Sequence, residues 1–112
     1  MPRRPARTPP PAVVIDTITQ VGRQIAAARR RRRWTQMDLA HKAGISRLTL
    51  QKLEAGAQGA SLAVFGAVLW AMGLDQPLTT IAALESDPEG AALEEARLGH
   101  RVRPAASIDD NF

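Results

Sequence analysis

The chain has 112 residues and no cysteine, so it is long enough for one compact domain and excludes disulfides, thiolate catalysis and cysteine-ligated metal sites. Its net charge of +4 hides a division, because residues 1–52 carry a net charge of +10 and residues 53–112 one of −6. A basic half favours a polyanionic partner. No apolar stretch reaches the roughly 20 residues of a membrane span, and no secretory leader is recognisable, so we expect a soluble, cytoplasmic protein without a membrane partner.

The first segment is rich in proline and arginine and reads MPRRPARTPPP. It contains too few bulky apolar residues to bury surface and order itself. We therefore expect residues 1–15 to form a disordered basic arm. The arm is either a solvated tail or a source of additional attraction to phosphate groups.

The next segment has the apolar spacing of a helix, at Ile18, Val21, Ile25 and Ala28. It predicts a helix from about Thr17 to Arg32, with Asp16 or Thr17 as its N-cap. Five arginines, at positions 29–33, close this helix, where the helix dipole favours cations. They suit phosphate contact better than a membrane surface, because large exposed apolar side chains do not accompany them.

Two short helices joined by a tight turn follow. Thr35 is the expected N-cap of the first, with Asp38 completing a capping box. Its apolar face is expected to comprise Met37, Leu39, Ala40 and Ala43. Gly44 ends it, because glycine adopts the left-handed conformation at low cost, and Ser46 caps the next helix.

The second short helix, residues 47–54, has two faces. Leu50 and Leu53 are expected to point inward, with Ile45 filling the turn. The outward face comprises Arg47, Leu48, Gln51 and Lys52. Such side chains can donate to guanine, pair with adenine or contact a thymine methyl group.

Two further helices complete the expected domain, residues 16–84. Ser61 caps the first, which ends at Gly73 and is expected to bury Leu62, Phe65, Val68, Leu69 and Met72. The second is a mostly apolar helix from Pro77 to Leu84. Residues 85–112 are expected to form a short helix after Asp87 and a mobile tail from residue 99.

The stretch Thr35–Gly56, TQMDLAHKAGISRLTLQKLEAG, closely resembles the XRE, or lambda-repressor-like, helix-turn-helix family. The family pattern reads T-Q-x-x-L-A-x-x-A-G-[IV]-S and, after regularly spaced apolar residues, L-E-x-G. With the flanking helices the resemblance covers about residues 17–84. It implies an all-α, five-helix DNA-binding domain.

The resemblance also implies roles for individual residues. Base-reading positions of the family fall on Arg47, Leu48 and Lys52, and Gln36 falls where the family contacts the phosphate backbone. Glu54 is implied to pair with Arg29, a contact that supports the fold and not base specificity. From their chemistry, Ser46, Thr49 and Arg33 are further candidates for phosphate contact, although Thr49 and Arg33 fit solvated side chains equally well.

The two tryptophans are assigned to different surroundings. Trp34 occupies a core leucine position of the family, so we expect it to pack under the helix that starts at Gln36. Trp70 is expected on the outer face of its helix, either at a protein interface or, more commonly, at the edge of the core.

The sequence shows no sign of catalysis. His41 and His100 have no carboxylate or second histidine at ligand spacing, and no glycine-rich phosphate loop follows a strand. We therefore expect no catalytic residue, no cofactor site and no metal site. The protein is expected to bind and not to be an enzyme.

Proteins with this pattern usually read palindromic operators in double-stranded DNA as homodimers, with recognition helices about 34 Å apart. The helix Pro77–Leu84 is the expected dimer surface, or else it packs against the first helix. Residues 87–93 and 98–103 resemble the tails of HipB-type antitoxins. This implies an autoregulating repressor that also binds a HipA-like serine/threonine kinase toxin. A repressor without a toxin and a module that binds only protein are the alternatives.

Overall fold

The computed structural model describes residues 8–101 and shows α-helices and short 3₁₀ turns, with no strand in that range. The helices are α1 (Ala12–Arg31), α2 (Gln36–Ala43), α3 (Arg47–Glu54), α4 (Leu62–Ala71) and α5 (Pro88–Arg101), and the 3₁₀ turns span Gln76–Thr80 and Leu84–Ser86. The chain divides into an amino-terminal unit, Met1–Asp75, and a carboxy-terminal unit, Gln76–Phe112. The predicted all-α, five-helix class is confirmed. The outer parts of the predicted arm and tail, residues 1–7 and 102–112, lie outside the described residues.

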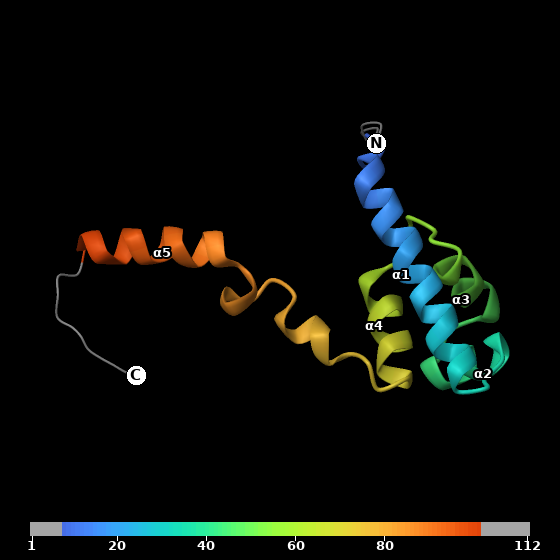
Figure 1. The fold of residues 1–112 in the computed structure, drawn as a ribbon. Coiled ribbons are helices and arrows are strands. Elements are labelled where there is room, and N and C mark those ends of the chain that lie inside the picture. The colour runs from blue at the N-terminus through green and yellow to red at the C-terminus, as the bar shows by residue number, and fades with distance from the viewer. Residues whose placement is uncertain (1–7, 102–112) are drawn as a thin grey trace, which may run out of the picture. The chain divides into compact units, whose positions relative to one another are not determined.

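Within the amino-terminal unit, α2 packs against both α3 and α4, and α1 packs against α3. In the view of Figure 1, α3 and α4 appear on either side of α1, and α2 lies near the carboxyl end of α1. The buried core has members on all four helices: Ile25, Ala28, Leu39, Ala40, Leu50, Leu53, Val68 and Met72. All eight were expected to point inward, because they repeat at helical spacing along their helices.

Two residues that were expected to be buried are exposed. Met37 exposes 62% of its surface and Leu62 76%. Both lie in the first turn of their helices, α2 and α4, at the edge of the core. Helical spacing alone does not show where a core ends along a helix.

Helix α1 begins earlier than predicted, at Ala12 after Pro11, which makes no side-chain capping bond. The expected cap at Asp16 or Thr17 is therefore wrong. Thr17 lies inside the helix, where its hydroxyl donates to the carbonyl of Val13 at 2.9 Å. This bond is the common alternative to capping for a threonine in a helix. Residues 12–15, which the sequence analysis placed in the arm, form the first turn.

The predicted helix Pro77–Leu84 is also wrong, because this segment forms two separate 3₁₀ turns. The hydroxyl of Thr79 donates to the carbonyl of Gln76 at 2.7 Å, and that of Thr80 donates to Pro77 at 3.5 Å. Such local bonds compete with α-helical ones. The expected start of α5 is present, since the amide of Gly90 donates to the carboxylate of Asp87 at 3.0 Å.

The four helices of the amino-terminal unit end in the same way. A residue with positive φ ends each of them: it is the C-cap Gly44 of α2, at 73°, and the residue after the C-cap in the other three, at 61° for Arg33, 82° for Gly56 and 74° for Gly73. The amide of the next residue then bonds back into the last turn, as from Ile45 to the carbonyl of Ala40 at 3.0 Å. This closure satisfies carbonyls that would otherwise lack partners.

Candidate nucleic-acid interface

The turn between α2 and α3 is short and closed by hydrogen bonds. Gly44 has the left-handed conformation, with φ of 73° and ψ of 31°, and the chain then extends through Ser46, which has ψ of 153°. The hydroxyl of Ser46 accepts the amide of Thr49 at 3.0 Å and so caps α3. The angle between α2 and α3 is therefore determined by local backbone geometry.

Helix α3 buries one face and presents the other to solvent. Leu50 and Leu53 belong to the core, and Ile45 packs against it from the turn. The exposed side chains are those of the predicted outward face: Arg47, Leu48, Gln51 and Lys52. Leu48 exposes 59% of its surface on this face.

The two hydroxyl residues at the start of α3 contact each other. The hydroxyl oxygens of Ser46 and Thr49 are 2.8 Å apart and share one hydrogen bond. Ser46 is exposed and Thr49 half-buried. Each can still accept or donate one further bond, so the pair can meet an anion at the start of α3.

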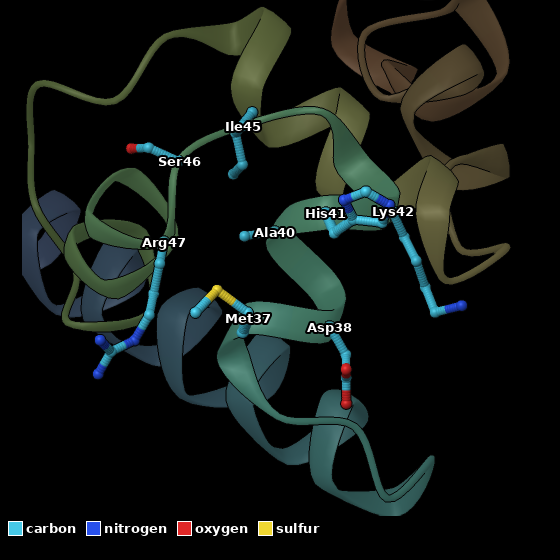
Figure 2. A pocket seen from close by; sticks show the side chains of 8 residues that line it. All are labelled: Met37, Asp38, Ala40, His41, Lys42, Ile45, Ser46 and Arg47. Atoms are coloured by element: carbon cyan, nitrogen blue, oxygen red, sulfur yellow. The ribbon is translucent and has the colours of Figure 1, made fainter.

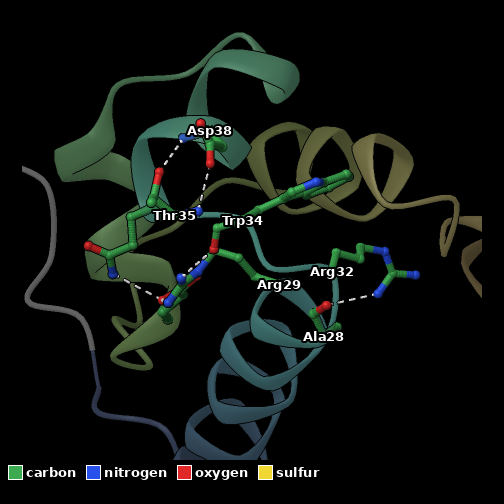
Figure 3. Close-up of polar contacts among 8 residues, drawn as sticks. Ala28, Arg29, Arg32, Trp34, Thr35 and Asp38 are labelled. Atoms are coloured by element: carbon green, nitrogen blue, oxygen red, sulfur yellow. Dashed lines mark hydrogen bonds and ion pairs between the residues drawn. The ribbon is translucent and has the colours of Figure 1, made fainter.

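A second polar cluster, shown in Figure 3, joins α1 to α2 and α3. The guanidinium of Arg29 donates to both carboxylate oxygens of Glu54, at 2.7 and 3.0 Å, and to the carbonyl of Trp34 at 3.0 Å. The Arg29–Glu54 pair implied by the resemblance is thus present, and the two side chains are only 11% and 7% exposed. Such a bidentate pair holds two helices at a defined distance and angle.

Gln36 belongs to the same cluster, which the sequence analysis did not anticipate. Its side-chain amide donates to Glu54 at 3.0 Å, so its orientation is set by the Arg29–Glu54 pair. The sequence did carry a signal for this contact. Gln36 belongs to the T-Q motif and Glu54 to the L-E-x-G motif, and the helix-turn-helix fold brings these two motifs together. The remaining polar atoms of the amide stay available to a ligand.

The arginines at the end of α1 have different surroundings. Arg32 donates to the carbonyls of Ala28 at 2.8 Å and Met72 at 3.1 Å, so it connects α1 to the end of α4. Arg30, Arg31 and Arg33 are exposed. A run of like residues in the sequence therefore comprises two structural side chains, at positions 29 and 32, and three solvent-facing ones.

An open hollow of about 480 Å³ lies where α2 meets the start of α3 (Figure 2). Its lining includes Met37, His41 and Lys42 from α2, and Ser46 and Arg47 from the start of α3. Asp38 is also in the lining and completes the predicted capping box with Thr35. Hydrogen bonds from the Thr35 amide and hydroxyl hold the pKa of the Asp38 carboxyl below its usual range.

Lys42, which lines this hollow, also lies over an aromatic ring. Its ammonium group lies 4.7 Å from the ring centroid of Trp34, a cation–π geometry. Trp34 packs against the core as predicted, and Trp70 exposes 64% of its surface on α4.

A second hollow, of about 470 Å³, lies on the other side of α3. It extends from Thr49 and Lys52 to the loop before α4, at Gly59, Ala60 and Ser61. This loop was not among the predicted site residues. Its position directly after the outward-facing helix, between two glycines, was the available signal.

Comparison with protein families matches residues 20–80 to a helix-turn-helix domain. Comparisons with curated proteins and with solved structures gave no match. In the described part of the chain, no helix is both long and apolar enough to cross a membrane. The matched segment covers more than half of the chain and includes α2, the turn and α3. The chain therefore belongs to a helix-turn-helix family, and its α1–α4 region is a DNA-binding domain of that family.

Proposed function

We propose that the protein is a transcriptional repressor that reads a palindromic operator as a homodimer, with α3 in the major groove. The carrying observation is the exposed face of α3 opposite the buried Leu50 and Leu53. In this arrangement Arg47 and Lys52 donate to base edges, Gln51 pairs with a base or a phosphate, and Leu48 contacts a thymine methyl group.

Phosphate contacts would flank this face. Gln36 at the start of α2 and the Ser46–Thr49 pair at the start of α3 have polar atoms at helix amino-termini, where the dipole favours anions. Arg33 contributes an exposed cation beyond the end of α1. Such contacts fix the register of the protein on DNA, whereas the α3 side chains read the sequence.

The test compares two exposed arginines by footprinting and by titration of single-base operator variants. Arg47→Ala should cost about 1–3 kcal/mol of binding free energy and relax the preference at one base position. Arg30→Ala is the matched control, since Arg30 is exposed but lies on α1, and it should leave base preferences unchanged. Unaltered preferences in the Arg47 variant would show that Arg47 reads no base.

We further propose that the repressor is a HipB-type antitoxin that binds a HipA-like kinase toxin. Support comes from α5, whose leucines Leu93 and Leu98 expose 65% and 46% of their surface beside acidic residues such as Glu94 and Glu95. Exposed apolar side chains with mainly acidic residues near them suit a protein partner. Co-purification with the product of a neighbouring kinase gene tests this role.

Two other outcomes would select the alternatives. Operator binding without any kinase partner would indicate a stand-alone regulator. A module that binds only protein would show no salt-sensitive binding to duplex DNA. A DNA-binding protein would show it, because phosphate contacts make log K fall with log salt concentration.

A further inference from the structure

Helix α4 is apolar around its full circumference. Its sequence, LAVFGAVLWA, contains no charged or hydrogen-bonding side chain apart from the indole N–H of Trp70. Helices of this composition are normally buried on all sides. In α4, however, only Val68 is fully buried, and it faces the core together with the neighbouring Met72.

The uncovered side of α4 forms a continuous stripe, which we call the α4 outer face. It comprises Leu62, Ala63, Gly66 and Trp70. Leu62 and Trp70 expose 76% and 64% of their surface, and Gly66, half-buried, lies midway between them along the helix. A large aromatic and a large aliphatic side chain exposed one turn on either side of a glycine resemble an uncovered interface, not a surface adapted to water.

Charge indicates what covers this face. Residues 8–75 carry nine lysines and arginines against four acids, so two copies of the amino-terminal unit repel each other over most of their surfaces. The α4 outer face carries no charge. It is therefore a place where a second copy can approach without like-charge repulsion.

The spacing of the stripe is self-complementary. Leu62 and Trp70 are each four residues from Gly66, so an antiparallel pair of α4 helices crossing at Gly66 sets Leu62 of one copy against Trp70 of the other, twice. An interface of two-fold symmetry requires this kind of reciprocal contact. Gly66 and Ala63 are small, which lets the two helices come close together.

We propose that the α4 outer face is the surface through which two copies of this chain pair, with the two-fold axis at Gly66. Leu62 lines a groove of about 270 Å³ together with apolar side chains of α1, α3 and α4, including Ile18, Leu53 and Phe65, and with the loop before α4. Trp70 of the second copy fills this groove. A tryptophan in an apolar pocket is the most common kind of energetic anchor in protein interfaces.

Pairing through α4 leaves the proposed DNA-reading helix free. The exposed α3 side chains Arg47, Leu48 and Lys52 are not part of the α4 outer face, so pairing through that face does not use them. The α4 outer face takes the place of the segment 77–84 as the dimer surface. The pairing rests on the proposed function only in that reading a palindromic operator is what the dimer would serve. Its tests are made without DNA, so its failure and a failure of DNA binding are separate results.

The first test is disulfide crosslinking in the full-length chain, which has no cysteine of its own. Gly66→Cys places two thiols at the axis, and mild oxidation should give a dimer of the crosslinked chain. Leu62→Cys is the control on the same face, because its two copies lie about 12 Å apart along antiparallel helices and cannot form a disulfide. Ala55→Cys, exposed at the end of α3, is the control away from that face.

A crosslink in the Gly66 variant alone supports the pairing and its register. Equal crosslinking of the Leu62 or Ala55 variant, or none in the Gly66 variant while it retains its helical circular dichroism, overturns it.

The second test needs no cysteine and measures mass by light scattering over a concentration series. Trp70→Arg should raise the dimer dissociation constant at least about thirtyfold, since it removes the anchor and adds like charge. Met37→Arg is a matched control, because Met37 is 62% exposed on α2 and should not alter dimerisation. A wild-type chain that is monomeric at every concentration, or an equal effect of both variants, overturns the proposal.

Discussion

Arg33 has the conformation of a glycine. Its φ of 61° lies in the left-handed region, where the three other helix ends of the amino-terminal unit have glycine. An L-residue there carries a cost of about 1–2 kcal/mol relative to the right-handed region. Its guanidinium is exposed and makes no hydrogen bond within the described residues, which leaves it open to the proposed phosphate contact.

We expect Arg33→Gly to raise the free energy of unfolding by about 0.5–1 kcal/mol, because it relieves the left-handed backbone at some cost in unfolded-state entropy. The same substitution should lower the slope of log K against log salt concentration for DNA by about one, if Arg33 contacts a phosphate. Arg31→Gly, at the last residue of α1, is the control and should reduce stability. Thermal unfolding and salt titration measure both effects, and a destabilised Arg33→Gly variant would contradict the strain argument.

Gln36 shows how one residue serves two purposes. Its amide is held by Glu54, which Arg29 holds in turn, so a candidate phosphate ligand is positioned by a nearly buried ion pair. Loss of the pair would therefore weaken the fold and misplace Gln36 at the same time.

Among the elements, α1 and α3 are in close backbone contact at Gly22. A Cβ atom built at Gly22 would lie 2.6 Å from the carbonyl oxygen of Glu54 and 2.7 Å from that of Leu53. Both are backbone atoms that cannot move without displacing α3. Gly22 therefore sets the distance between α1 and the DNA-facing helix.

We expect Gly22→Ala to lower the free energy of unfolding by about 1–3 kcal/mol, the usual cost of overpacking. Gly59→Ala is the matched control, because a Cβ atom there meets nothing within 4 Å, and its stability should equal or slightly exceed that of the wild type. Chemical denaturation of both variants measures the difference. A Gly22→Ala variant as stable as the control would show that the two helices can separate at little cost.

At the scale of the whole molecule, the two units differ in packing and in charge. The amino-terminal unit has a core contributed by four helices, whereas residues 76–99 include none that is buried. An isolated helix of 14 residues, the length of α5, is marginally stable in water. The acidic, exposed segment 76–99 is suited to become more ordered when the proposed partner binds it.

Amide hydrogen exchange of the free protein should therefore distinguish the units. We expect protection of less than about tenfold in α5, and of at least about 1000-fold at the buried turns of α1, α2 and α3. Mass spectrometry of peptides from each helix measures this. Protection of α5 equal to that of α3 would show that α5 already packs as firmly in the free chain. Addition of the proposed kinase partner should raise protection in α5 alone.

Much of the α2–α3 region was predictable from the sequence, since its signals are local. The capping hydroxyls of Thr35 and Ser46, the turn at Gly44 and the spacing of Leu50 and Leu53 each act within one or two turns of helix. The start of α1 and the segment 77–84 were not predictable in this way. Val13 and Val14 are exposed and face no core, so apolar spacing could not indicate the start of α1. In the segment 77–84, hydrogen bonds from the hydroxyls of Thr79 and Thr80 favour 3₁₀ turns over an α-helix.

The amino-acid sequence by itself determined the ends of α2, the start of α3, the turn between them and the outward face of α3, because caps, left-handed residues and apolar spacing act over a few residues. Only the tertiary structure decided that Gly22 lies against the backbone of α3, that Gln36 joins the Arg29–Glu54 pair and that one side of α4 stays uncovered. These features depend on which residues distant in the chain meet in space. Packing of complete helices, and not any local preference, brings those residues together.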